Sequence, residues 1–179
     1  MICINPNGII RWKVYIEHVP DMIPTGVSNI VVDRNGTIYY IVSWANSQSY
    51  TANLCRITQA NTDYPNQLCV RNYQLFGGIT QPLAYNEIYD LLITAVVDNK
   101  FGSVSAAIDK TSLEILWINR HYFGAGTGGH YKIDNGTGYM YWIGDDDYLL
   151  KFDQKGNHTL IDGLVEIVHS KPSQINYYM

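Results

Sequence analysis

The sequence is poor in the residues that mark a disulfide-dense scaffold, a nucleic-acid-binding surface or a membrane span. Only three of its 179 residues are cysteine, which excludes a framework of many disulfides. Twelve Lys and Arg residues are scattered among sixteen Asp and Glu, so a net charge of -4 offers no basic patch to nucleic acid or an anionic membrane. The longest apolar run, residues 91–97, is far shorter than the roughly 20 residues of a membrane-spanning helix.

The sequence carries mixed signals about its compartment. Residues 1–8 contain neither the basic segment nor the apolar stretch of a signal peptide, so the chain is either cytoplasmic or extracellular with its natural beginning missing. Three N-glycosylation sequons fall at turn-like positions and begin at Asn35, Asn135 and Asn157. Two interpretations stay open, because Asn-Gly also forms turns in any compartment.

The cysteines leave a similar choice. Cys55 and Cys69 lie in two runs that could face each other across a hairpin, and in an oxidising compartment they could form a disulfide. The alternative is that both fill space as free thiols, and Cys3 is left over in either case.

Strand signals dominate the chain, because fifteen Tyr with many Ile and Val cluster in short runs that Gly, Asn and Asp separate. Residues 31–42 place Asn35-Gly36 between two such runs, which predicts a hairpin. Residues 131–142 repeat this order, and residues 83–94 hold a degraded version of it. The period of roughly 50 residues is the length of one four-stranded propeller blade with long loops.

A second pattern accompanies each hairpin. Residues 107–117 read as an apolar strand, an Asp, a short turn and a strand that ends on Trp117, and residues 2–12 have the same order and end on Trp12. This order resembles the repeat of pyrroloquinoline-quinone-like, or quinoprotein dehydrogenase-like, β-propellers. The resemblance implies that Trp12 and Trp117 pack between neighbouring blades. The pattern departs from the family at residues 54–73, which end without Trp, and after Asp153, so it implies the fold and not an activity.

We therefore predict an all-β chain, residues 1–179, forming one partial β-propeller domain with about three to four blades of four antiparallel strands. The expected units are residues 1–25 as half a blade, 26–73, 79–120 and 127–163, with a tail at 164–179. Such an open arc exposes strand edges. Three explanations are considered: the tail closes a small ring, two copies pair, or the chain is part of a larger propeller, which the initial half-blade favours.

Motifs that suggest a bound ligand have simpler explanations. The glycines of residues 124–129 match a dinucleotide fingerprint, but the alternating residues after them predict a strand where that fingerprint needs a helix. The consecutive carboxylates of residues 145–147 point in opposite directions on an extended chain, which favours a turn over a calcium site. No His spacing indicates a metal site, although His121 and His130 flank the glycine loop and form the one pair worth testing.

No catalytic constellation is recognised, and we predict no catalytic, cofactor-binding or metal-binding residues. The expected function is a non-catalytic propeller scaffold that binds a protein partner or self-associates through blade edges. Two alternatives stay open. One is a fragment of a propeller enzyme, quinoprotein-like or carbohydrate-active; the other is a secreted or surface glycoprotein.

Overall fold

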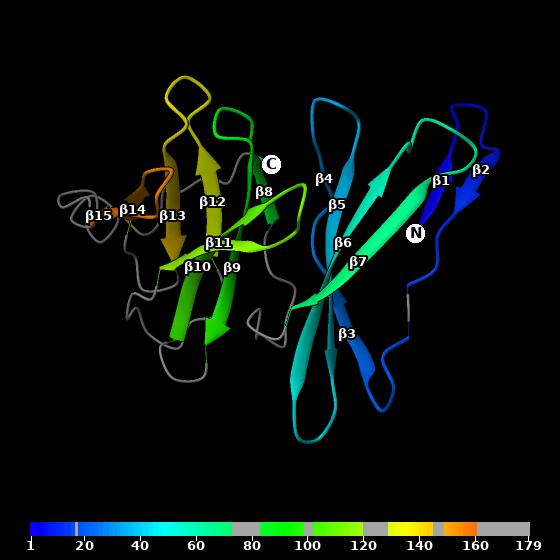
Figure 1. Ribbon diagram of the computed structural model, residues 1–179, viewed down its shortest axis with the longest axis horizontal. Helices are drawn as coiled ribbons and strands as arrows, with labels where there is room; N and C mark the ends of the chain where they lie inside the picture. The colour runs from blue at the N-terminus through cyan, green and yellow to red at the C-terminus, as the bar shows by residue number, and fades with distance from the viewer. Residues whose placement is uncertain (17, 73–82, 99–101, 120–128, 145–148, 161–179) are drawn as a thin grey trace, which may run out of the picture.

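The computed structural model describes residues 1–16, 18–72, 83–98, 102–119, 129–144 and 149–160, which form four antiparallel sheets (Figure 1). These residues contain no helix, so the predicted all-β fold is confirmed. Within the same ranges there is accordingly no helix that is long and apolar enough to cross a membrane.

The strands of each sheet follow one another in chain order. Sheet A consists of β1 (Ile2–Ile4) and β2 (Ile10–Lys13). Sheet B consists of β3 (Ile23–Val27) and β4 (Val31–Val32), which share one edge of β5 (Ile38–Ala45), then β6 (Tyr50–Thr58) and β7 (Asn66–Asn72). Sheet C consists of β8 (Leu83–Asn86), β9 (Leu91–Asp98), β10 (Gly102–Asp109) and β11 (Ile115–Asn119). Sheet D consists of β12 (Gly129–Ile133), β13 (Met140–Gly144), β14 (Leu149–Phe152) and β15 (His158–Leu160).

The sheets pack face to face, because sheet B and sheet C are apolar on both faces. Along β5, Tyr40 and Val42 belong to the core shared with Trp12 of sheet A, whereas Tyr39 and Ile41 belong to the core shared with sheet C. This follows from the strand period of two residues, which sends neighbouring side chains to opposite faces. A third core joins sheets C and D. Three apolar layers therefore hold four sheets in a row.

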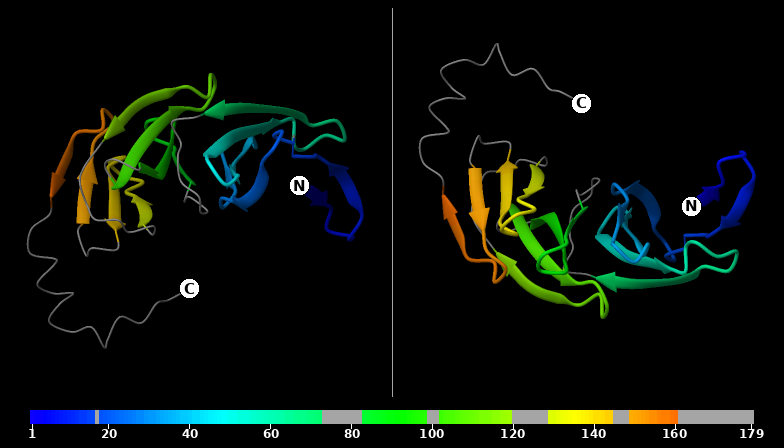
Figure 2. Two further views of the ribbon diagram at one scale, coloured as in Figure 1. Left: turned by 90° about the horizontal axis from the view of Figure 1, so that it is seen from below. Right: turned by 90° about the horizontal axis from the view of Figure 1, so that it is seen from above.

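Figure 2 shows this row as an open, curved arc with sheet A at one end and sheet D at the other. The first strands of sheets B, C and D contact one another, β4 with β8 and β8 with β12. The last strands, β7, β11 and β15, lie toward the convex side of the arc (Figure 2). The sheets therefore lie closest together at their first strands and diverge toward their last strands, an arrangement that we call a fan.

Six tight turns lie at the same end of their strands in all four sheets. We call this end of the molecule the turn end. In a four-stranded meander the first and third turns must lie at the same end, and contacts between adjacent sheets place all these turns together. At each turn one Asn or Asp side chain accepts hydrogen bonds from nearby groups, such as Asp33 Oδ1 from the amides of Asn35 and Thr37. The other turns use Asn5, Asn86, Asp109, Asp134 and Asp153. This chemistry explains why short Asx-containing sequences recur along the chain.

Candidate functional site

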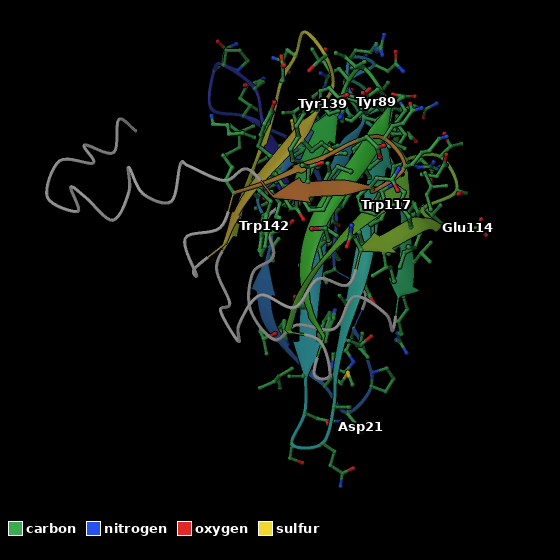
Figure 3. The ribbon with its side chains drawn as sticks, turned by 90° about the vertical axis from the view of Figure 1, so that its left-hand side faces the viewer. Asp21, Tyr89, Glu114, Trp117, Tyr139 and Trp142 are labelled. Carbon is green, nitrogen blue, oxygen red and sulfur yellow. A yellow bond between two sulfur atoms is a disulfide. The ribbon has the colours of Figure 1, made fainter. Side chains whose placement is uncertain are left out.

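Side chains at the turn end reach from each sheet to backbone oxygens of the next sheet. Arg34 of sheet B donates to the carbonyl oxygen of Glu87 in sheet C at 2.8 Å. Tyr89 of sheet C donates through its hydroxyl to the carbonyl oxygen of Thr137 in sheet D at 2.9 Å. Figure 3 shows Tyr89 near Tyr139 at the turn end, whereas Asp21 lies at the opposite end of the molecule. The same kind of contact thus recurs one sheet further along.

The two tryptophans singled out in the sequence both lie between sheets. Trp12 on β2 donates through Nε1 to the carbonyl oxygen of Ala60 in sheet B at 2.8 Å. Trp117 on β11 donates through Nε1 to the carbonyl oxygen of Gln154 in sheet D at 3.0 Å, and its ring stacks on Phe152 with the ring centroids 6.4 Å apart. Each indole therefore joins the last strand of one sheet to the turn of the following sheet.

Sheet B has no tryptophan on its last strand, β7, and an arginine on the preceding strand, β6, contacts the turn of sheet C. Arg56 on β6 donates to the carbonyl oxygens of Thr111 and Lys110, which lie in the turn between β10 and β11. The absence of a tryptophan from β7 agrees with the sequence pattern, in which residues 54–73 depart from the Trp-ended repeat.

A buried ion-pair cluster joins sheets B and C at the turn end. Lys110 Nζ lies 3.0 Å from Asp33 Oδ2 and 2.8 Å from Asp90 Oδ1. The Asp33 side chain is 2% exposed and the Lys110 side chain 12%, whereas Asp90 is half exposed. Tyr39 donates to Asp33 Oδ2 at 3.3 Å, and Tyr85 donates to Asp90 Oδ1 at 2.6 Å. The cluster thus brings five titratable side chains from sheets B and C into one group of contacts.

The cluster keeps its charges at neutral pH. Burial opposes ionisation of Asp33, but hydrogen bonds from Lys110 and from the amides of Thr37 and Asn35 outweigh it and hold the pKa of Asp33 below its ordinary value. Burial also disfavours the charged amine of Lys110, yet its bonds to Asp90 and Asp33 raise its pKa. Burial and the charge of Asp33 raise the pKa of Tyr39 to about 12.

These shifts have a chemical consequence. A lysine nucleophile or base must be neutral at working pH, and a carboxyl group that acts as a general acid must be protonated. Lys110 and Asp33 are shifted in the opposite directions. The cluster is therefore suited to hold two sheets together and not to transfer protons.

The sequon asparagines are all exposed and all lie at the turn end. Asn35 is in the turn between β4 and β5, Asn135 in the turn between β12 and β13, and Asn157 directly before β15. The side-chain amide of Asn157 donates to Asp153 Oδ2 at 2.9 Å.

The cysteines behave differently from one another. Cys55 on β6 and Cys69 on β7 are directly opposite in the strand register and form a disulfide with an S–S distance of 2.07 Å. Cys55 is fully buried in the core between sheets A and B. Cys3 is a free, half-buried cysteine that packs against the same core.

Several residues discussed from the sequence fall where the structure gives no description. His121, residues 124–128 and residues 145–147 lie outside the described residues, as does the side chain of His130. Among the side chains that are described, no group of three or more His, Cys, Asp or Glu residues could hold a metal ion.

Sheet A forms an incompletely covered end of the row. Sheets B, C and D are each four strands wide, whereas β1 pairs only with β2 in the described part of the chain. Cys3 and Trp12 face sheet B, so Ile2 and Ile4 face away from it, and they are 54% and 59% exposed. Within the described ranges the other edge of β1 has no paired strand, and it lies beside these exposed isoleucines.

The first strands of sheet B are also incompletely covered on the face that packs against sheet A. Val27 and Val32 pair with Val42 and Ile38, which both belong to the core facing sheet A. Both Val27 and Val32 are nevertheless exposed, and among the described residues no strand lies beside β1 to cover them.

The ion-pair cluster was not foreseen from the sequence. Asp33 and Lys110 are 77 residues apart, and no local pattern connects them. The aspartate is recognisable as a turn residue, but its second role depends on how sheets B and C stack. Comparison with known proteins adds no further guide, since no family model, curated protein or solved structure matches this chain.

Proposed function

We propose that the four sheets are blades of a β-propeller related to the pyrroloquinoline-quinone-like repeat and that the chain is a non-catalytic assembly module. The fan of four-stranded meanders supports this fold, as do the two indole contacts between adjacent sheets. In this proposal the molecule associates with a second polypeptide, in the first place another copy of itself, through the sheet A end.

The single observation that carries the proposal is that sheet A has only two strands in the part of the chain that the structure describes. An unpaired strand edge presents backbone donors and acceptors that another strand can satisfy. The isoleucines beside it, Ile2 and Ile4, are exposed although the equivalent faces inside the row are buried. A partner that adds strands at β1 would satisfy the backbone groups and cover Val27 and Val32 at the same time.

The ion-pair cluster supports a non-catalytic role. Its lysine is held protonated and its buried aspartate ionised, so neither group suits acid–base or nucleophilic chemistry at neutral pH. The contacts that Arg34, Tyr89 and Trp117 make between sheets each end on a backbone carbonyl oxygen in a turn of the next sheet, which suits a scaffold.

Sedimentation velocity over a hundredfold range of protein concentration tests this proposal. We expect the mass to rise above that of one chain as the concentration increases, and the double variant Ile2→Lys with Ile4→Lys to remain monomeric. Both side chains point to solvent, so the variant should keep its far-UV spectrum and unfolding midpoint.

The matched control is Tyr64→Lys, which adds a charge at another strongly exposed position, in the turn between β6 and β7. It should associate like the unchanged chain. A chain that is monomeric at every concentration would contradict self-association through sheet A, and so would association that the double isoleucine variant leaves unaltered.

A further inference from the structure

The three N-glycosylation sequons share one end of the molecule. They belong to two sheets, Asn35 to sheet B and Asn135 and Asn157 to sheet D, and are separated by up to 122 residues in sequence (157 minus 35), yet the meander topology places each of them at the turn end. Asn35 and Asn135 each precede a glycine in a turn, and both side chains are exposed. A glycan on either residue would extend into solvent without disturbing a core.

The sequons alone do not separate acceptor sites from ordinary turns, because Asn-Gly is favoured in turns for its backbone geometry. A second, independent observation points to the same compartment. The Cys55–Cys69 disulfide joins two neighbouring strands of sheet B, and disulfides persist in the oxidising environment through which secreted and cell-surface proteins pass. N-glycosylation occurs in proteins that follow this route.

We infer that the turn end is an N-glycosylated face, with glycans on Asn35 and Asn135. Asn157 is not part of this inference, because its side-chain amide already donates to Asp153 in the folded sheet. The two proposed sites lie in sheets B and D, on either side of sheet C.

The modification is a group transfer from a lipid-pyrophosphate-linked oligosaccharide. The Nδ2 atom of asparagine forms a bond to the anomeric carbon of the first sugar. The bond from that carbon to the phosphate oxygen breaks, the lipid pyrophosphate leaves, and Nδ2 loses one proton. No oxidation or reduction takes place, and the amide keeps one N–H.

A glycosylated turn end restricts where protein partners can dock. Bulky, hydrated sugars above sheets B and D would keep another protein away from the turns. The apolar end at sheet A and the end of the molecule opposite the turns would stay accessible. The inference therefore divides the molecule into a sugar-bearing face and protein-binding faces, and it does not depend on the proposed assembly function.

Peptide mass spectrometry of the chain from its natural source tests the inference, with and without enzymatic removal of N-glycans. We expect the peptides that contain Asn35 and Asn135 to carry glycan mass and to be converted to aspartate on enzymatic release. Either asparagine unmodified in the disulfide-bonded natural protein would overturn the inference.

Secreted expression in a eukaryotic host supplies a second test with matched variants. Asn35→Gln and Asn135→Gln should each remove one glycan from the mass, whereas Thr37→Ser should keep the glycan on Asn35, because Ser also completes the sequon. The turn of sheet A offers a gain of function. Asn7-Gly8 precedes Ile9, which is 63% exposed, and Ile9→Thr should add one glycan on Asn7. Secreted, folded protein that carries no glycan on Asn35 and Asn135 would contradict the inference.

Discussion

Gly156 lies directly against the indole ring of Trp117, so close that a Cβ atom at Gly156 would come within 2.6 Å of Cδ2 of the ring. The glycine has a positive φ of 80° in the turn between β14 and β15, and its carbonyl oxygen accepts from the side-chain amide of Asn119. Gly156, which has no side chain, thus allows the last strand of sheet C to pack closely on the turn of sheet D, where Trp117 also donates to Gln154.

Replacement of this glycine should weaken the contact between sheets C and D. We expect Gly156→Ala to lower the free energy of unfolding by about 3 kcal/mol, because the methyl group clashes with Trp117 and the backbone conformation is unfavourable for alanine. Gly36→Ala is the control, because Gly36 has a similar φ of 77° with no atom within 4 Å of the added carbon, and it should cost about 1 kcal/mol. Urea unfolding of both variants measures the difference. Equal losses would show that the ring contact is unimportant.

Removal of the Lys110 charge should destabilise the chain through Asp33. In Lys110→Met the buried carboxylate of Asp33 loses its partner, and we expect a loss of about 3 kcal/mol. Asp33→Asn keeps an oxygen that can accept from the amides of Asn35 and Thr37, so the double variant should be less destabilised than the sum of the two single changes. A double-mutant cycle by urea unfolding tests this. Additive losses would contradict direct coupling.

The carboxylates of the turns should make the fold sensitive to acid. Burial opposes ionisation of Asp33, Asp90 and Asp153, yet hydrogen bonds lower the pKa of each. The bonds come from Lys110 for Asp33 and Asp90 and from Asn157 for Asp153. The pKa of Asp109 is lowered chiefly by the hydrogen bond from the amide of Ser112. A lowered pKa stabilises the folded state above the unfolded value of about 4, and this stability is lost as pH falls through the folded pKa.

We therefore expect a stability plateau from about pH 5 to about pH 9 and a decline below pH 4. Lys110 acts at the other limit, since its raised pKa gives stability that is complete below about pH 10 and is lost at higher pH. Urea midpoints measured between pH 2 and pH 6 check the acid limb, which should be shallower in Asp33→Asn. An identical slope in that variant would mean that Asp33 does not contribute.

Reduction of the disulfide should destabilise sheet B. Cys55 and Cys69 are 14 residues apart in sequence, and a loop of this length predicts a loss of about 3 kcal/mol when the bond is removed. The double variant Cys55→Ala with Cys69→Ala and the reduced protein should both show the loss in urea unfolding. Cys3→Ser is the control for the thiol outside the bond. It keeps the disulfide, so reductant should destabilise it as much as the unchanged chain. Unchanged stability on reduction would contradict a structural role.

Local features of the fold were predictable because they depend on a few neighbouring residues. Asn35-Gly36 predicted the hairpin between β4 and β5, and the structure places Gly36 there with a positive φ that glycine adopts without strain. The hairpin at Asn86 was also foreseen from its degraded pattern. The amide-binding role of Asp33 follows equally from its position before a turn.

Features that depend on stacking were not predictable from one sequence. The second role of Asp33, as partner of Lys110, requires sheets B and C to be packed in one register. Arg56 on β6 joins the same two sheets, and nothing in the residues around it indicates that its partners are the carbonyl oxygens of Thr111 and Lys110. Such contacts arise only once distant segments are brought side by side.

The row of sheets also sets how opening of the fold spreads. Each apolar layer joins only adjacent sheets. Local unfolding of one sheet therefore destabilises its direct neighbours most, and the effect decreases with distance along the row, as in repeat proteins. Sheet A has one neighbour and two short strands, whereas sheet B is clamped on both sides. Backbone amide protons should therefore exchange with solvent first in β1 and β2 and last in β5 and β6, which makes the terminal sheet the point from which the chain frays.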